Sequence, residues 1–282
     1  MRDIVASFGA EWLKLSRRPA TWVLAILLPA LLVALGYGLI LVEVVALRNT
    51  HTTAANHATI QHAIDSLQLS LYPERVARRV LNAFTGLAYG NAIAVIVGVL
   101  CYGSEYGWAT MKTIFTTRPG RLATFLGKMG ATAVQLAIFT VLMFAAAAVA
   151  ATILGGVYGH LTPWPDALTF VKAFLAAWLL MGLWCALGVL LSVLFRQAAL
   201  AIGLGIVYAV VVEGVVVNVL SAVSSLRDVQ RVFPGANGTA LVDSFLNGSS
   251  LAGPTQAALV VAAYTAVFLL VSAVLLRHRD VT

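Results

Sequence analysis

The sequence contains little charge. Only 10% of its 282 residues are charged, 61% are hydrophobic, and the mean hydropathy is +0.93. Soluble globular domains carry about 25% charged and about 45–50% apolar residues. This deficit excludes an ordinary soluble domain and predicts a polytopic membrane protein, whose apolar helix faces meet membrane lipid and whose helices associate by close packing.

Cysteines and catalytic motifs are also scarce. Cys101 and Cys185 lie in different apolar runs, so we expect two buried thiols and neither a disulfide nor a metal framework. A phosphate-binding loop would end in Gly-Lys-Ser/Thr, but Met129 follows Gly127-Lys128. The sequence also lacks His-Glu-x-x-His and paired carboxylates within its apolar runs. It therefore predicts no catalytic residues, no metal site, no cofactor in this chain and no enzymatic activity.

Six apolar runs reach the length of about 20 residues that a membrane-spanning helix needs. Because each run is continuous and does not alternate with polar residues, the runs predict helices and not strands. We expect an all-α polytopic membrane protein with one transmembrane domain over residues 1–282. Pro29 lies inside the first run and predicts a bend there. The runs cover approximately Thr21–Leu41, Ala83–Tyr102, Met129–Gly155, Thr169–Leu194, Ala198–Leu220 and Thr255–Leu276.

Basic residues are unevenly distributed among the segments that connect these runs. The N-terminus, the loop 103–128, Arg196 and the C-terminus hold eleven of the 18 Lys and Arg residues against four acids. The opposite segments hold seven against six acids. Since Lys and Arg mark the cytoplasmic side of short loops, both termini are predicted to be cytoplasmic in a multi-pass cell-membrane protein. The isoelectric point near 9.7 follows from this asymmetry and requires no nucleic-acid partner.

Residues 1–20 have the pattern of an amphipathic helix. Phe8 and Trp12 share one stripe with Ile4 and Leu15, and the charged residues lie elsewhere. This pattern predicts an interfacial helix with its aromatic rings in the acyl boundary of the inner leaflet. The alternative is an ordinary soluble segment that leads into the first span.

Two outer segments are substantial. The loop 43–82 is predicted to be helical, with Pro73 opening a second helix, and its apolar stripe needs a partner. The loop 221–254 is turn-rich, and its short apolar stretches predict brief helices in the outer leaflet between spans five and six. The stripe of the first loop consists of Ile60, Ile64, Leu67 and Leu71, and its histidines, His51, His57 and His62, share no helix face.

Glu213 is the one acidic residue deep in an apolar run. A carboxylate in the bilayer costs roughly 2.5–3.5 kcal/mol on insertion scales, so it normally faces a cavity or a partner. One interpretation is a contact for substrate or for gating. The other is a hydrogen-bonded structural residue, and the sequence does not choose between them.

The loop 103–128 combines both charge signs with exposed aromatic residues. Residues 105–114 can form a short helix capped by Ser104. Aromatic residues among charges suit a protein-docking surface, and Trp108 is the largest of them here. The alternative is an interfacial helix whose aromatic rings rest among lipid headgroups.

The same loop resembles the segment between spans two and three of bacterial ABC transporter permeases of the type-2 exporter class. The similarity rests on Ser104-Glu105-Tyr106, Met111-Lys112-Thr113, Arg118-Pro119-x-Arg121 and Gly127-Lys128. The opening Glu11-Trp12-x-Lys14-Leu15-x-Arg17-Arg18-Pro19, the hinge Leu194-Phe195-Arg196 and the outer Phe233-Pro234-Gly235-Ala236-Asn237 are similar to that family as well.

This resemblance implies a homodimer of six-span permeases with two separate ATP-binding cassette subunits, which bind ATP and Mg and drive a substrate outward. The loop would be the coupling helix that docks on the ATPase. Its coupling residues would be Glu105, Tyr106, Trp108, Lys112, Arg118 and Arg121. The alternative function is a non-transporting membrane anchor that transmits force to an extracytoplasmic partner through residues 43–82.

The charge distribution makes a prediction about topology. In a variant without Cys101 and Cys185, His57→Cys and Asn247→Cys should react with a membrane-impermeant thiol reagent in intact cells, whereas Arg118→Cys should react only after lysis. The reverse labelling pattern would invert the orientation.

Overall fold

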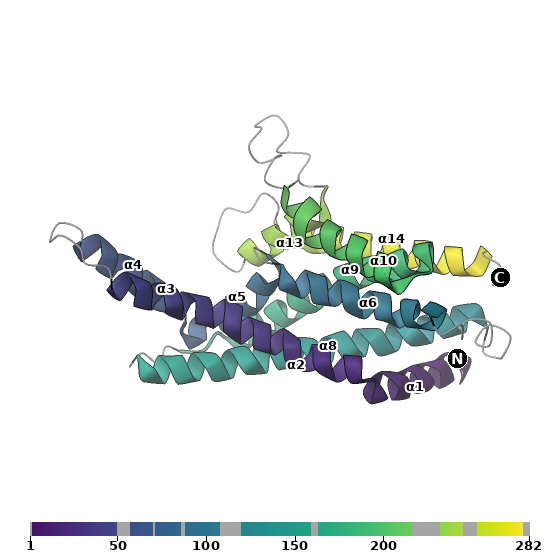
Figure 1. Ribbon diagram of the computed structural model, residues 1–282, viewed down its shortest axis with the longest axis horizontal. Coiled ribbons are helices and arrows are strands. Elements are labelled where there is room, and N and C mark those ends of the chain that lie inside the picture. The colour runs from purple at the N-terminus through teal and green to yellow at the C-terminus, as the bar shows by residue number, and fades with distance from the viewer. Residues whose placement is uncertain are drawn as a thin grey trace.

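The computed structural model describes residues 2–49, 57–69, 71–85, 88–107, 120–158, 163–215, 232–244 and 253–278. Within these ranges every regular element is a helix (Figure 1). Among the described residues, five helices are long and apolar enough to cross a membrane, or six if one bent helix pair counts as a single span. The prediction of an all-helical, multi-span protein is therefore confirmed.

The first span is one long helix with an elbow before it. Helix α1 (Arg2–Arg17) ends just before Pro19, which opens α2 (Pro19–Leu31) at a position where a missing N–H costs no hydrogen bond. The chain stays helical through Pro29, widens into a π-helical segment (Leu32–Gly38), and continues as α3 (Leu39–Arg48). The Trp22 indole donates a hydrogen bond of 2.9 Å to the Ser16 carbonyl across the elbow.

The second span is broken. A 3-10 turn (Pro73–Arg75), α5 (Val76–Leu81) and a second 3-10 turn (Asn82–Phe84) precede α6 (Tyr89–Gly107), and the two parts are bent by 58°. Ala88 adopts a left-handed conformation with φ 49° immediately before α6. The predicted run that begins at Ala83 therefore crosses this bend, which hydropathy does not detect. Pro73 does open a helical turn, as predicted.

The remaining helices follow in order. Asp166 caps α9 with its carboxylate, which accepts the Thr169 N–H. Arg196, with φ 53°, reverses the chain between α9 and α10 at the predicted hinge. The helices are α8 (Arg121–Val157), α9 (Ala167–Phe195), α10 (Ala198–Ile206) with a π-helical extension (Val207–Val212), α13 (Pro234–Asp243) and α14 (Pro254–His278).

Helix α6 lies at the centre of the bundle and packs most extensively against α9. Their backbones touch where both helices carry glycine: a Cβ added to Gly98 would overlap the Cys185 carbonyl, and one added to Gly188 would overlap the Val95 carbonyl. In membranes, small residues stabilise helix pairs in this way because they allow close van der Waals contact.

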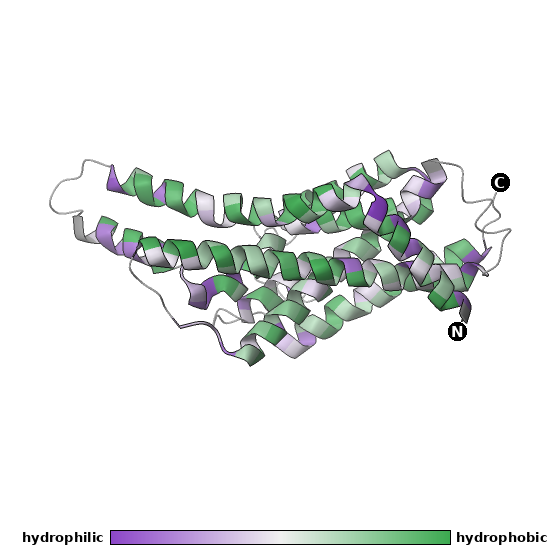
Figure 2. Cartoon of the chain, turned by 90° about the horizontal axis from the view of Figure 1, so that it is seen from below, coloured by the Kyte–Doolittle hydropathy of each residue, from purple (hydrophilic) through white to green (hydrophobic). Residues whose placement is uncertain are grey.

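The loop 43–82 folds back on the first span. Helix α4 (His57–Leu69) packs along α3, and Ile64 and Leu71 of its predicted stripe are buried. The α3–α4 pair projects at one end of the molecule, while α1 and the last turn of α14 lie at the other (Figure 1). Hydrophobic residues cover the long helices between these ends (Figure 2). The stripe thus finds a partner within the chain.

The glycine contact makes a prediction about stability. Gly188→Ala should destabilise the purified chain by about 1–3 kcal/mol, because its methyl group would push α6 and α9 apart. Gly182→Ala, on the same helix with open space around it, should be neutral or stabilising, since Ala is the better helix former. Thermal unfolding in detergent measures both, and equal midpoints for the two variants would contradict the close contact.

Candidate functional site

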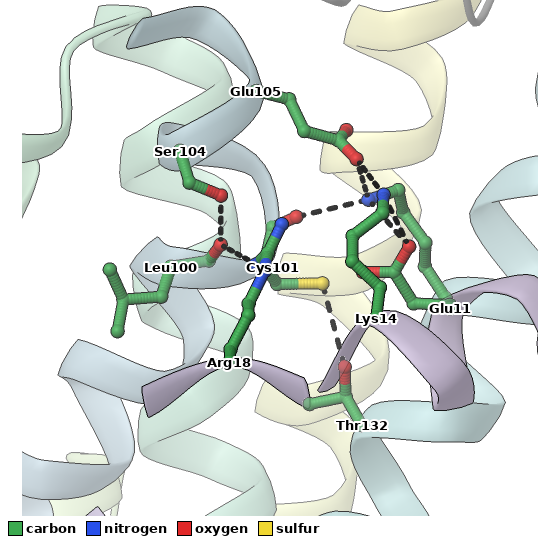
Figure 3. Close-up of polar contacts among 9 residues, drawn as sticks. Glu11, Lys14, Arg18, Leu100, Cys101, Ser104, Glu105 and Thr132 are labelled. Carbon is green, nitrogen blue, oxygen red and sulfur yellow. Dashed lines mark hydrogen bonds and ion pairs between the residues drawn. The ribbon is translucent and has the colours of Figure 1, made fainter. Parts of the chain in front are cut away.

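Four charged side chains meet where α1, α6 and α8 come together (Figure 3). We call Glu11, Lys14, Glu105 and Lys128 the ionic cluster. Lys128 Nζ donates to Glu105 Oε1 at 2.6 Å and lies 3.3 Å from Glu11 Oε2. Lys14 Nζ donates to Glu105 Oε1 at 2.7 Å and to Glu11 Oε2 at 3.0 Å. Each carboxylate therefore faces both ammonium groups.

Most of the ionic cluster is buried. The side chains of Glu105 and Lys128 are each 1% exposed and that of Glu11 is 4% exposed, whereas Lys14 lies at the rim with 36%. Lys128 also donates to the Cys101 carbonyl at 3.1 Å, and its ammonium lies 4.9 Å from the centroid of the Tyr102 ring. Buried charges are tolerated when they are paired and hydrogen-bonded, and each of these four charges has an oppositely charged hydrogen-bond partner. In the described part of the chain, Glu11 Oε1 is buried without a hydrogen-bond partner.

Two features of the sequence place α1 at the cluster: the spacing of its charged residues, and glycines on α8 that allow α1 to approach closely. Glu11 and Lys14 are three residues apart and so share one face of α1. On α8, a Cβ at Gly127 would lie 2.8 Å from the Phe8 backbone nitrogen, and one at Gly130 would lie 3.3 Å from the Phe8 ring. Phe8, which we predicted to face lipid, thus packs on α8, and Trp12 is half-buried. The interfacial position of α1 stays a prediction.

The cluster shifts the titration of its two α1 members. Burial is the largest influence on Glu11 and opposes its charge, but the attraction and hydrogen bonds of Lys128 and Lys14 together lower its pKa below 4.5. Burial likewise opposes the charge of Lys14 most strongly, whereas Glu105 and Glu11 together raise its pKa above 10.5.

These directions set the pH range in which the two groups stabilise the fold. The Glu11 contribution is complete above pH 4.5 and is lost as the pH falls through its lowered pKa. The Lys14 contribution is complete below pH 10.5 and is lost as the pH rises through its raised pKa. Both contributions are therefore present at neutral pH.

The predicted coupling residues occupy different environments. Glu105 belongs to the ionic cluster, and Tyr106 packs against a small apolar cluster that includes Tyr102. Arg121 donates to the Leu276 and Arg277 carbonyls at 3.5 and 3.3 Å, so it caps the C-terminal end of α14, where carbonyls lack partners within the helix. Trp108, Lys112 and Arg118 lie outside the described residues. Their shared role in ATPase coupling stays a prediction.

Glu213 joins the fifth span to α13. The Tyr208 hydroxyl donates to its Oε1 at 3.1 Å, and the Gly235 N–H donates to its Oε2 at 3.1 Å. Gly235 lies in the first turn of α13, where free N–H groups and the helix dipole favour a carboxylate. A Cβ at Gly235 would overlap this carboxylate. The geometry favours the structural interpretation of Glu213, and the outer-leaflet position of α13 stays a prediction.

The structure describes only part of the two outer loops and of the histidines in the first of them. His62 is exposed on α4. His51 and the His57 side chain lie outside the described residues, as do residues 216–231 and 245–252.

A comparison with protein families places this geometry in context. The model of the ABC-2 family transporter proteins matches residues 7–212, more than two thirds of the chain. The chain belongs to the ABC-2 transporter family. The match includes all four members of the ionic cluster and confirms the resemblance derived from the loop 103–128. An ABC-2 chain is a permease component of an ABC transporter, and the family implies partnership with an ATP-binding subunit. Comparison with curated proteins finds no similar sequence.

Sequence reasoning missed the ionic cluster as a unit. Glu11, Lys14 and Lys128 stood in the motifs that carried the family resemblance, but none of them was selected as a site residue. A usable signal was present: Lys128 directly precedes the long apolar run that begins at Met129, and a lysine there needs an acidic partner.

The buried ion pair between Lys128 and Glu105 leads to a prediction about stability. Lys128→Met should lower the unfolding free energy by about 3–5 kcal/mol, because Glu105 and Glu11 lose their buried partner. Lys172→Met, at an exposed position of α9, is the matched control and should change it by less than about 0.5 kcal/mol. Adding Glu105→Gln to Lys128→Met should restore part of the loss. Equal unfolding midpoints for the two single variants would show that the cluster does not stabilise the fold.

Proposed function

We propose that this ABC-2 permease is the transmembrane subunit of an ATP-driven exporter. A separate ATP-binding subunit would bind ATP and Mg and carry out hydrolysis, and this chain would move a substrate outward without catalytic residues or a cofactor of its own. The observation that carries the proposal is the ionic cluster. It joins both helices that flank the loop 103–128 to the N-terminal helix.

The geometry supports transmission of motion from this loop. Glu105 lies in the last turn of α6, and Lys128 lies two turns into α8. Their ion pair holds the two flanking helices together, and Lys14 and Glu11 attach α1 to the same point. Arg121 attaches the start of α8 to the end of α14. A partner that pushes on the loop would therefore move four helices together.

In this proposal both termini are cytoplasmic and the ATPase docks at the α1 end of the molecule. A second copy of the chain would complete the transporter as a homodimer. Glu105 and Arg121 then act as positioning residues, since their side chains bind other parts of this chain. Trp108, Lys112 and Arg118 remain the candidates for direct contact with the ATPase.

The alternative, a non-transporting anchor that acts on an outer protein through residues 43–82, has less support. The apolar stripe on α4 would be the natural docking face, but it packs along α3. The opposite face of α4 carries exposed polar residues such as Gln61 and Asp65.

The coupling proposal is tested by co-expressing the chain with its ATP-binding subunit. Trp108→Ala should lower recovery of the complex, or the amount of substrate transported per ATP hydrolysed, by at least about fivefold. The reason is that buried aromatic anchors carry much of the binding energy of an interface. Trp164→Ala, the same change before α9 at the opposite end, should leave complex recovery, hydrolysis and transport unchanged.

The chain purified alone should not hydrolyse ATP. Unaltered complex recovery, hydrolysis and transport in Trp108→Ala would count against the loop as the coupling element, and hydrolysis by the isolated chain would count against a separate ATPase subunit.

A further inference from the structure

The fifth span contains a π-helical segment, Val207–Val212, between α10 and the last described residues of the span. In a π-helical turn the backbone bonds join residues five apart, so the turn holds one residue more than an α-helical turn. Here the Glu213 N–H binds the Tyr208 carbonyl, five residues before it. Because such segments are rare and occur mostly at functional sites, we looked for a contact that favours this one over an α-helix.

The side chains of the same two residues make such a contact. The Tyr208 hydroxyl donates to Glu213 Oε1 at 3.1 Å. In an α-helix, side chains five residues apart point about 140° away from each other, because each residue turns the helix by about 100°. In a π-helical turn they lie one above the other. The bond between Tyr208 and Glu213 is therefore specific to the π-helical register.

Glu213 also connects this register to α13. Its Oε2 accepts the Gly235 N–H at 3.1 Å, and a Cβ at Gly235 would overlap that oxygen, so the carboxylate reaches the backbone only past a glycine. Helix α13 itself packs mainly on α14, with smaller contacts to α9 and to the 3-10 turn Asn82–Phe84. One carboxylate thus joins the π-helical register of the fifth span to a helix that rests on other parts of the bundle.

The fifth span is packed tightly before the segment and loosely after it. Before the segment, a Cβ at Gly205 would overlap the Val95 side chain of α6. After it, outside the backbone of its own helix, nothing that the structure describes lies within 4 Å of a Cβ added to Gly214. Val211 and Val215 are 53% and 56% exposed. The end of the span therefore has room to turn about its own axis while its base stays fixed on α6.

The π-helical segment of the first span, Leu32–Gly38, is held differently. Its Tyr37 is 2% exposed, and the Tyr37 hydroxyl donates to the Ala147 carbonyl of α8 at 3.1 Å. A Cβ at Gly36 would lie 3.5 Å from Arg79 Cδ, so the arginine stem covers that side. Neighbouring helices fix this segment by packing, whereas the segment of the fifth span depends on the bonds of Glu213.

We propose that the π-helical segment of the fifth span is a conformational switch, and that the hydrogen bonds of Glu213 hold it in one state. While the carboxylate binds Tyr208 and Gly235, the π-helical register is kept. When α13 moves away from the carboxylate, the segment converts to an α-helix, and the residues beyond it turn by about 100°. An element with two discrete arrangements can pass a displacement from one helix to another. This inference does not depend on the ATP-binding subunit.

The test measures the rotation by double electron–electron resonance on the full-length chain in lipid nanodiscs, with Cys101 and Cys185 replaced. Two pairs of spin labels share Ile138→Cys, an exposed position of α8. The tip pair joins it to Val215→Cys beyond the segment, and the reference pair joins it to Leu204→Cys before the segment. Since side-chain tips lie about 5–6 Å from the helix axis, a turn of about 100° moves the tip at residue 215 by about 8 Å.

The chain with Glu213 and Gly235 intact should give one distance for each pair. Glu213→Leu and Gly235→Ala should each give the tip pair a second distance, several Å from the first, and leave the reference pair unchanged. Glu213→Gln should keep the single distance, because its amide oxygen can accept the Gly235 N–H. Gly214→Ala is the matched control for Gly235→Ala, since its methyl group meets open space, and it should keep the single distance as well.

Three results would overturn the switch. The first is an unchanged tip-pair distance in both Glu213→Leu and Gly235→Ala. The second is an equal shift of the tip pair and the reference pair, which would mean general loosening of the bundle. The third is a shift in Gly214→Ala as large as that in Gly235→Ala. Failed insertion does not confuse the result for Glu213→Leu, because leucine suits the bilayer better than a carboxylate does.

Discussion

The buried ion pair between Lys128 and Glu105 is the interaction on which the α1 end of the molecule depends. An ammonium and a carboxylate, each 1% exposed, hold α8 to α6 at 2.6 Å. Because neither charge is stable in that environment alone, the two helices have one arrangement in which both are satisfied. Glu11 and Lys14 extend the arrangement to α1, and the position of α1 in turn sets the elbow between α1 and α2. The segment between α6 and α8 therefore starts and ends on helices whose positions are fixed together.

Hydropathy predicted the helices because each span must bury its backbone hydrogen bonds and expose apolar side chains to lipid. It placed the start of the second span at Ala83 and did not detect the bend that follows, because residues on both sides of the bend are apolar and buried. The left-handed backbone at Ala88 lies at this bend, and the missing side chain of Gly90 makes room for the Phe84 ring across it. Both are properties of the backbone path, which composition does not carry.

The partners of the site residues within the chain were not predicted, because they are distant in sequence. Glu105 was assigned to a docking surface since it lies in a polar loop, but Lys14, 91 residues before it, and Lys128, 23 residues after it, enclose its carboxylate. Arg121 likewise binds carbonyls at the far end of the chain. For Glu213 the physical argument required a polar partner in the membrane, and the fold supplies one from a helix 22 residues away. Local patterns indicate that a charge needs a partner and do not identify which partner it finds.

The glycine contact between α6 and α9 has a mechanical consequence. Where Gly98 meets Cys185 and Gly188 meets Val95, no layer of side chains separates the two backbones. Side chains can change rotamer and let helices slide, but carbonyl groups fixed in helical hydrogen bonds cannot. In the proposed coupling, α6 and α9 would therefore shift together, and α10, which follows α9 after Arg196 and Gln197 and packs on α6, would shift with them. A displacement that begins at Glu105 would then pass from α6 to α9 through this contact, and the helix borders packed through longer side chains would be the places that rearrange.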